Sequence, residues 1–128
     1  KMLDAAEDAA ELLSREGFST TVWDARVVCP LDSDMLADAA RHPFVITVED
    51  GLRDGGVGSM VTRRLVEESI EPTLPRVRVL GIPNAYIPHG NANEILSDLG
   101  LDALGITASA RELMTNWGAR PSREATPA

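Results

Sequence analysis

The stretch FVITVEDGLRDGGVGS, residues 44–59, decides how this chain folds. Its first five residues, Phe44–Val48, are apolar or β-branched without polar alternation, which predicts a central strand covered on both faces. A turn and a glycine-rich segment follow. Beyond them, apolar residues recur at helical spacing at Met60, Val61, Leu65 and Val66. The stretch therefore predicts a strand, a glycine loop and a helix, in that order.

Gly55, Gly56 and Gly58 have two physical uses at such a crossover. Glycine permits positive φ and close backbone approach, and free N–H groups at a helix start bind a carboxylate or phosphate. The lysine of a P-loop is missing, and the G-G-x-G spacing differs from the dinucleotide fingerprint. Tight packing of the helix on the sheet is the simpler interpretation. An anion or a neighbouring chain segment docking at the loop is the alternative.

Upstream of this stretch, the pattern predicts a helix over residues 3–17, a strand over 20–28 and a helix over 33–42. The first helix is amphipathic and begins almost at the first residue. A βα unit needs a strand before its helix. We therefore expect the first strand of the domain to lie upstream of residue 1.

Downstream, the pattern predicts a short strand over residues 77–80, a loop over 84–91, and helices over 91–99 and 107–117. Strands that alternate with helices indicate an α/β fold, here a three-layer α/β/α sandwich with a mainly parallel sheet. We expect one domain over residues 1–117. Residues 118–128 lack periodicity, which predicts a flexible tail.

Composition excludes several classes of function. The chain has 128 residues, of which 44% are hydrophobic and 25% charged, as in a single soluble domain. A net charge of −8 argues against a nucleic-acid partner. No apolar run is long enough for a membrane span, and we expect a cytoplasmic protein. Cys29 is the sole cysteine, and with His42 and His89 it makes no cluster of metal-ligand spacing.

Four segments resemble one family. They are Val22–Asp32, Val45–Ser59, Leu80–Gly90 and Glu94–Ile106. In this order and spacing they are similar to the C-terminal domain of 1-deoxy-D-xylulose 5-phosphate synthase, within the wider transketolase and 2-oxoacid dehydrogenase group. The resemblance implies a transketolase C-terminal-like fold.

The resemblance also implies a function for the full enzyme. That enzyme is a transferase that uses thiamine diphosphate and Mg²⁺ to decarboxylate pyruvate and join the two-carbon unit to glyceraldehyde 3-phosphate. Its product feeds isoprenoid, thiamine and pyridoxal synthesis. The two preceding domains of the same polypeptide bind both cofactors. This implies that the present chain has no catalytic, cofactor-binding or metal residues, is inactive alone, and helps to hold a homodimer together.

Four residues outside the glycines are candidates for a cleft edge or an interface. Glu49 and Asp50 follow the central strand, where open α/β sheets bind ligands, but they can also cap the turn and hydrogen-bond the glycine loop. His89 lies in a loop, where it can point to a cofactor cleft or be structural. Arg26 can pair with an acid across a domain or dimer interface, or bind substrate.

Two other assignments remain open from the sequence. One is the corresponding domain of a transketolase or of a 2-oxoacid dehydrogenase β subunit. The other is a free-standing, flavodoxin-like module that binds an anion or small molecule at the glycine loop.

Overall fold

The computed structural model describes residues 1–118 of the chain, with side chains described up to residue 116. The tail expected over residues 118–128 lies outside this part, apart from Gly118. In chain order, the helices and strands of the described part are α1 (Leu3–Arg15), α2 (Ser33–Ala40), β1 (Phe44–Leu52), α3 (Val57–Glu68), β2 (Arg76–Ile82), α4 (Ala92–Asp98) and α5 (Ala103–Gly118).

The sheet consists of β1 and β2, which pair in parallel. Phe44 lies opposite Arg76, and the register continues to Val48 opposite Leu80. An irregularity follows before Leu52 pairs with Ile82. Because parallel neighbours need a crossover, α3 connects the two strands and packs on them. The predicted α/β class, parallel pairing and strand–loop–helix order are confirmed.

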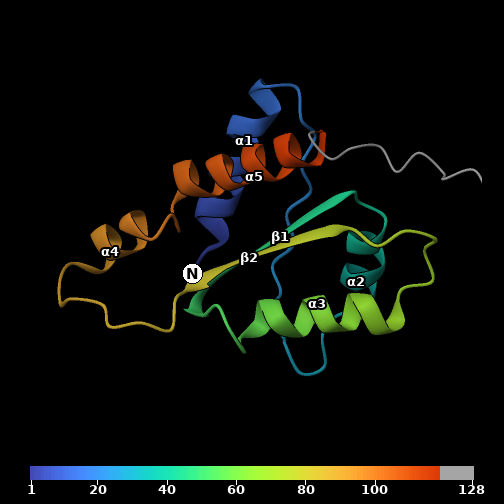
Figure 1. Cartoon of the computed structure of the whole chain (residues 1–128), viewed down its shortest axis with the longest axis horizontal. Coiled ribbons are helices and arrows are strands. Elements are labelled where there is room, and N and C mark those ends of the chain that lie inside the picture. Colours follow the sequence, from blue (N-terminus) through green and yellow to red (C-terminus); the bar gives the residue numbers. More distant parts are fainter. Residues whose placement is uncertain (119–128) are drawn as a thin grey trace, which may run out of the picture.

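Helices cover both faces of the sheet, which gives three layers (Figure 1). α1 and α5 pack on each other on one side, and α5 contacts both strands. α2 and α3 lie on the other side, where α3 contacts both strands. α4 lies away from these layers and contains no buried residue.

The apolar core has two parts. One lies between α2 and α3 and contains Leu31, Met35, Leu36, Ala40, Val61 and Leu65. The other includes Ala9 and Leu13 of α1 together with Leu113 of α5. An ion pair supports this second contact, since Arg111 Nε donates to Glu16 Oε1 at 2.9 Å.

The strand expected over residues 20–28 does not form. These residues are irregular, and only an isolated bridge joins Val28 to Leu31. A strand needs a partner for its backbone groups, and β-branched residues alone do not supply one. The same absence corrects the expectation for Phe44–Val48. Within the described residues β1 pairs only with β2, so it is an edge strand with half-buried side chains.

The last helix starts earlier than the sequence pattern predicted, at Ala103 instead of Thr107. Asp102 explains the difference, because its carboxylate accepts a hydrogen bond from the backbone N–H of Gly105 at 2.8 Å. A carboxylate in this position caps the free N–H groups of a first helical turn. Thr107 is therefore a buried residue inside the helix, where its hydroxyl donates to the carbonyl of Ala103 at 2.7 Å.

Candidate functional site

Glu49 binds the start of α3. It lies near the carboxyl end of β1, and its two carboxylate oxygens accept hydrogen bonds from the backbone N–H groups of Val57 at 3.1 Å and Gly58 at 3.0 Å. The first N–H groups of a helix lack partners within the helix and carry partial positive charge. A side chain of the chain itself therefore occupies the place where the glycine loop would hold an external anion.

Gly56 and Gly58 bring α3 close to β1. A Cβ atom on Gly56 would lie 2.1 Å from the carbonyl oxygen of Leu52 and 2.6 Å from Glu49 Oε1. A Cβ atom on Gly58 would lie 2.4 Å from Thr47 Oγ1. Such distances are far below ordinary contact, so both positions require glycine. The structure therefore shows that these two glycines allow α3 to pack closely on β1.

Gly55 serves the loop in a different way. Its φ of +85° lies in the left-handed region, where glycine has no Cβ penalty. Its N–H donates to Ser59 Oγ at 3.1 Å, and the Ser59 hydroxyl donates to the carbonyl of Arg53 at 3.2 Å. The loop is thus fixed by its own hydrogen bonds.

The other three candidates lie apart from this loop. Asp50 is exposed, and its carboxylate lies 3.5 Å from Lys1 Nζ. Arg26 donates to Asp24 at 2.9 Å, which raises the pKa of the guanidinium, so its partner in this chain is local. His89 is exposed in the loop between β2 and α4 and has no hydrogen bond or ion pair within the part of the chain whose side chains are described.

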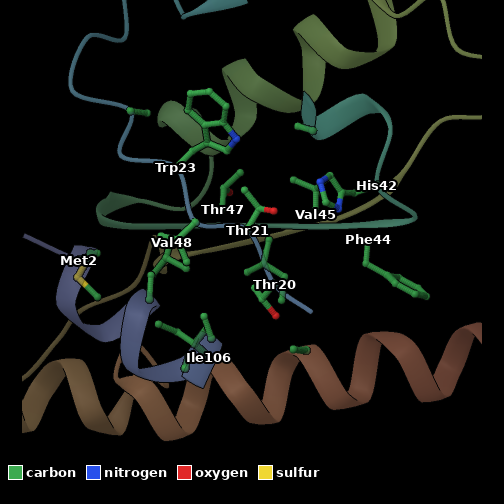
Figure 2. Close-up of a pocket in the computed structure, with 18 of the residues that line it drawn as sticks. Met2, Thr20, Thr21, Trp23, His42, Phe44, Val45, Thr47, Val48 and Ile106 are labelled. Carbon is green, nitrogen blue, oxygen red and sulfur yellow. The ribbon is translucent and has the colours of Figure 1, made fainter. Parts of the chain in front are cut away.

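A cavity of about 580 Å³ lies beside β1 and was not expected from the sequence. It is bounded by β1 on one side and by residues 17–25 on another, with helices above and below (Figure 2). Met2 and Ile106 line it on the α1 and α5 side, and Trp23 on the α2 side. Residues 20–25, which were expected to be part of a strand, form part of its wall with an irregular backbone instead.

A polar cluster around Asp38 joins the cavity wall to α2. The indole N–H of Trp23 donates to Asp38 Oδ2 at 2.8 Å, and Arg41 donates to Oδ1 at 3.2 Å. His42 Nε2 lies 3.6 Å from the same carboxylate. The Trp23 hydrogen bond, followed by Arg41 and His42, holds the pKa of Asp38 below its ordinary value. The hydrogen bond from Trp23 thus links the irregular segment before α2 to α2 itself.

The described residues do not fit a site for a metal and a diphosphate. Within residues 1–118 no three His, Cys, Asp or Glu side chains lie close enough together to hold a metal ion. The N–H groups that would suit a phosphate at α3 are bound by Glu49.

No helix in the same part of the chain has the length and apolar character needed to cross a bilayer.

Comparison with known protein families shows to which family this chain belongs. Residues 1–106 match the family described as "Transketolase, C-terminal domain". The chain belongs to this family. The resemblance of the four segments described above is thereby confirmed, and so is the transketolase C-terminal fold.

Parts of proteins named 1-deoxy-D-xylulose-5-phosphate synthase are similar to this chain. The protein of Magnetococcus marinus is 40% identical over 109 residues, which cover 85% of this chain and 18% of that protein. That of Cupriavidus metallidurans is 46% identical over 103 residues, covering 79% and 16%. Synthase 1 of Kitasatospora griseola is 36% identical over 127 residues, covering 96% and 19%. The chain thus spans less than a fifth of each of these relatives.

Proposed function

We propose that this chain is the C-terminal domain of a 1-deoxy-D-xylulose 5-phosphate synthase. The observation that carries the proposal is the identity of 40% over 85% of the chain to a protein of that name. The whole enzyme would decarboxylate pyruvate and join the two-carbon unit to glyceraldehyde 3-phosphate, with thiamine diphosphate supplying the electron sink for the decarboxylation. Its product would serve isoprenoid precursor synthesis.

Within that enzyme the domain has a structural role. Preceding domains of the same polypeptide bind thiamine diphosphate and Mg²⁺, and this domain packs against them and supports a homodimer in the cytoplasm. Two observations support the role. The described residues do not fit a metal–diphosphate site, and the carboxylate of Glu49 takes up the N–H groups at the start of α3. The glycine loop therefore positions a helix. Among the candidate residues, we favour His89 for a role at the edge of the cofactor cleft. Its side chain is exposed and has no partner within the described residues.

The test uses the complete gene product. Purified with thiamine diphosphate and Mg²⁺, it should release CO₂ from pyruvate only when glyceraldehyde 3-phosphate is present, and consume the two in equal amounts. Transfer of a two-carbon unit from a ketose phosphate without CO₂ would indicate a transketolase instead. Transfer of an acyl group to a lipoyl carrier would indicate a 2-oxoacid dehydrogenase. Either result would overturn the proposal.

The free-standing anion-binding module fits the loop less well. It requires open N–H groups at the start of α3, and those of Val57 and Gly58 are bound by Glu49. A gene whose start codon directly precedes Lys1 would favour that alternative and contradict the synthase.

A further inference from the structure

Residues 83–99, between β2 and α5, extend away from the rest of the molecule (Figure 1). We call this segment the arm; it consists of the loop after β2, helix α4 and Leu99. None of its residues is buried, and Tyr86 is 91% exposed. Each of the other four helices of the described part contributes side chains to the core, whereas α4 contributes none. The core therefore does not hold the arm in place.

The arm also makes no polar contact with the body of the domain. Within the described residues, its hydrogen bonds join residues of the arm to one another or to residues 100–102 directly after it. A helix shorter than about 12 residues is only marginally stable in water by itself, and α4 has 7 residues. A segment with so few contacts opens easily unless a partner covers it.

The composition of the arm favours a protein as this partner. The arm contains no Lys or Arg, so it offers no permanent cation to a phosphate or an acidic ligand. Tyr86 is exposed, and the side chains of Ile87, Ile95 and Leu96 are only half-buried. Protein interfaces are rich in aromatic residues and poor in lysine, and tyrosine is among the residues that dominate their binding energy.

The length of the relatives indicates which protein surface this is. The match to synthase 1 of Kitasatospora griseola covers 96% of this chain but 19% of that protein. Most of such a protein therefore lies outside this chain and shares a polypeptide with the arm. A tethered partner has a high effective concentration, so a small contact surface is enough to bind it.

We propose that the arm is the surface with which this domain docks on the preceding domains of the gene product, with Tyr86 as the anchoring side chain. The inference rests on the proposed function, because it requires those domains. Docking would bury Tyr86 together with the exposed parts of Ile87 and Ile95. It would also bring His89, three residues after Tyr86, to the boundary with those domains.

Photocrosslinking in the complete gene product tests the docking. Tyr86→p-benzoyl-phenylalanine keeps an aromatic ring at this position, and mass spectrometry after irradiation locates the residues that it captures. We expect capture of residues before Lys1. The same replacement at Glu7, which is exposed on α1, is the matched control and should capture about tenfold less, because it has no docked neighbour. Capture only within residues 1–128, in the same or a second copy, would overturn the proposal, and so would equal capture from both positions.

Amide hydrogen exchange in the complete gene product provides a second test. The N–H groups of Ile95 and Leu99 are bonded to carbonyls within the arm. They should exchange on the order of 100-fold more slowly than in an unstructured peptide, because the docked arm cannot open freely. Exchange at the rate of an unstructured peptide would overturn the docking.

A substitution separates the role of Tyr86 from the fold of the domain. Tyr86→Ser should speed the exchange of Ile95 and Leu99 by on the order of tenfold, while Leu65, in the core, stays within about twofold. Ile70→Ser is the matched control, because it removes an apolar side chain that is 97% exposed outside the arm. It should leave the exchange of the arm unchanged. The same result for both variants would contradict the anchoring role of Tyr86.

The docking and the synthase assignment can fail separately. A gene product that forms the cross-links from position 86 but lacks synthase activity would support the docking and overturn the proposed function. An active synthase in which position 86 captures nothing before Lys1 would overturn the docking and leave the proposed function in place.

Discussion

At Gly56 a hydrogen atom stands where any other residue would place a carbon 2.1 Å from the carbonyl oxygen of Leu52. The φ of Gly56 is −83°, so the requirement for glycine is steric and not a matter of left-handed backbone. The opposite holds at Gly55, whose φ is +85° and whose Cβ would meet nothing within 4 Å. Neighbouring glycines in one loop are thus required for different reasons.

Gly56→Ala should lower the free energy of unfolding by about 1–3 kcal/mol, because the loop must shift to admit the methyl group. Gly90→Ala is the matched control, since its Cβ would meet nothing closer than 3.8 Å, and should change stability by less than about 0.5 kcal/mol. Urea unfolding of the two variants measures both. Equal stability of the two would show that α3 does not pack on β1 as described.

Glu49→Ala should lower the free energy of unfolding by about 1.5–3 kcal/mol, because two N–H groups lose a charged acceptor. Glu49→Gln keeps one acceptor oxygen and should lose about half as much. Asp50→Asn removes a neighbouring carboxylate in an exposed pair and should cost less than about 1 kcal/mol. Chemical denaturation compares the three variants. A larger effect for Asp50→Asn would reverse the roles given to the two acids.

At the scale of elements, capping sets where the last helix begins. The Asp102 carboxylate accepts from the Ser97 hydroxyl at 2.6 Å and from Gly105 N–H at 2.8 Å. These hydrogen bonds, that of Ser97 first, hold the pKa of Asp102 below its ordinary value of 3.8. The bond from Ser97 reaches α4 and the bond from Gly105 reaches the first turn of α5, so one side chain joins the two helices.

The Asp102 contribution to stability depends on pH. A lowered pKa in the folded state means that the contribution is complete above the ordinary value of 3.8 and is lost as the pH falls through the folded value. Asp102→Ala should cost about 0.5–2 kcal/mol at pH 7 through loss of the cap. Its difference from the unmodified chain should shrink as the pH falls below about 4. Thermal unfolding at pH 7 and pH 3 measures this, and a difference that grows in acid would contradict it.

At the scale of the whole molecule, two layers of helices enclose a small parallel sheet. α1 and α5 are joined by apolar packing and by Glu16 and Arg111, and α2 and α3 share the other core. Between these layers the sheet has two strands within the described residues, with a cavity at its open edge.

Calorimetry should detect no binding of thiamine diphosphate with Mg²⁺ to the 128-residue chain at micromolar concentrations. The reason is that its described residues offer no metal cluster, and that Glu49 binds the N–H groups of Val57 and Gly58 at the start of α3. The complete gene product should bind the same cofactor in the same buffer, which makes it the positive control. Micromolar affinity of the chain itself would overturn the assignment of cofactor binding to other domains.

How much the sequence predicted varies from segment to segment. Residues 44–59 were predicted correctly as a strand, a glycine loop and a helix, because their signals are local: a β-branched run, loop glycines and 3.6-residue spacing. Residues 20–28 carried the same kind of local strand signal and did not form a strand, since no partner backbone lies beside them. The bond from Glu49 to α3 was one of two alternatives, and the loop geometry selects it.

By itself, the sequence determined the α/β class, the family, and the order of the elements apart from the strand expected over residues 20–28, because apolar periodicity, capping residues and family motifs are local properties of the chain. Only the tertiary structure decided that Glu49 occupies the start of α3 and that a cavity lies beside β1. These features depend on which backbones meet across the sheet. Pairing between segments far apart in the chain leaves no local pattern from which to predict it.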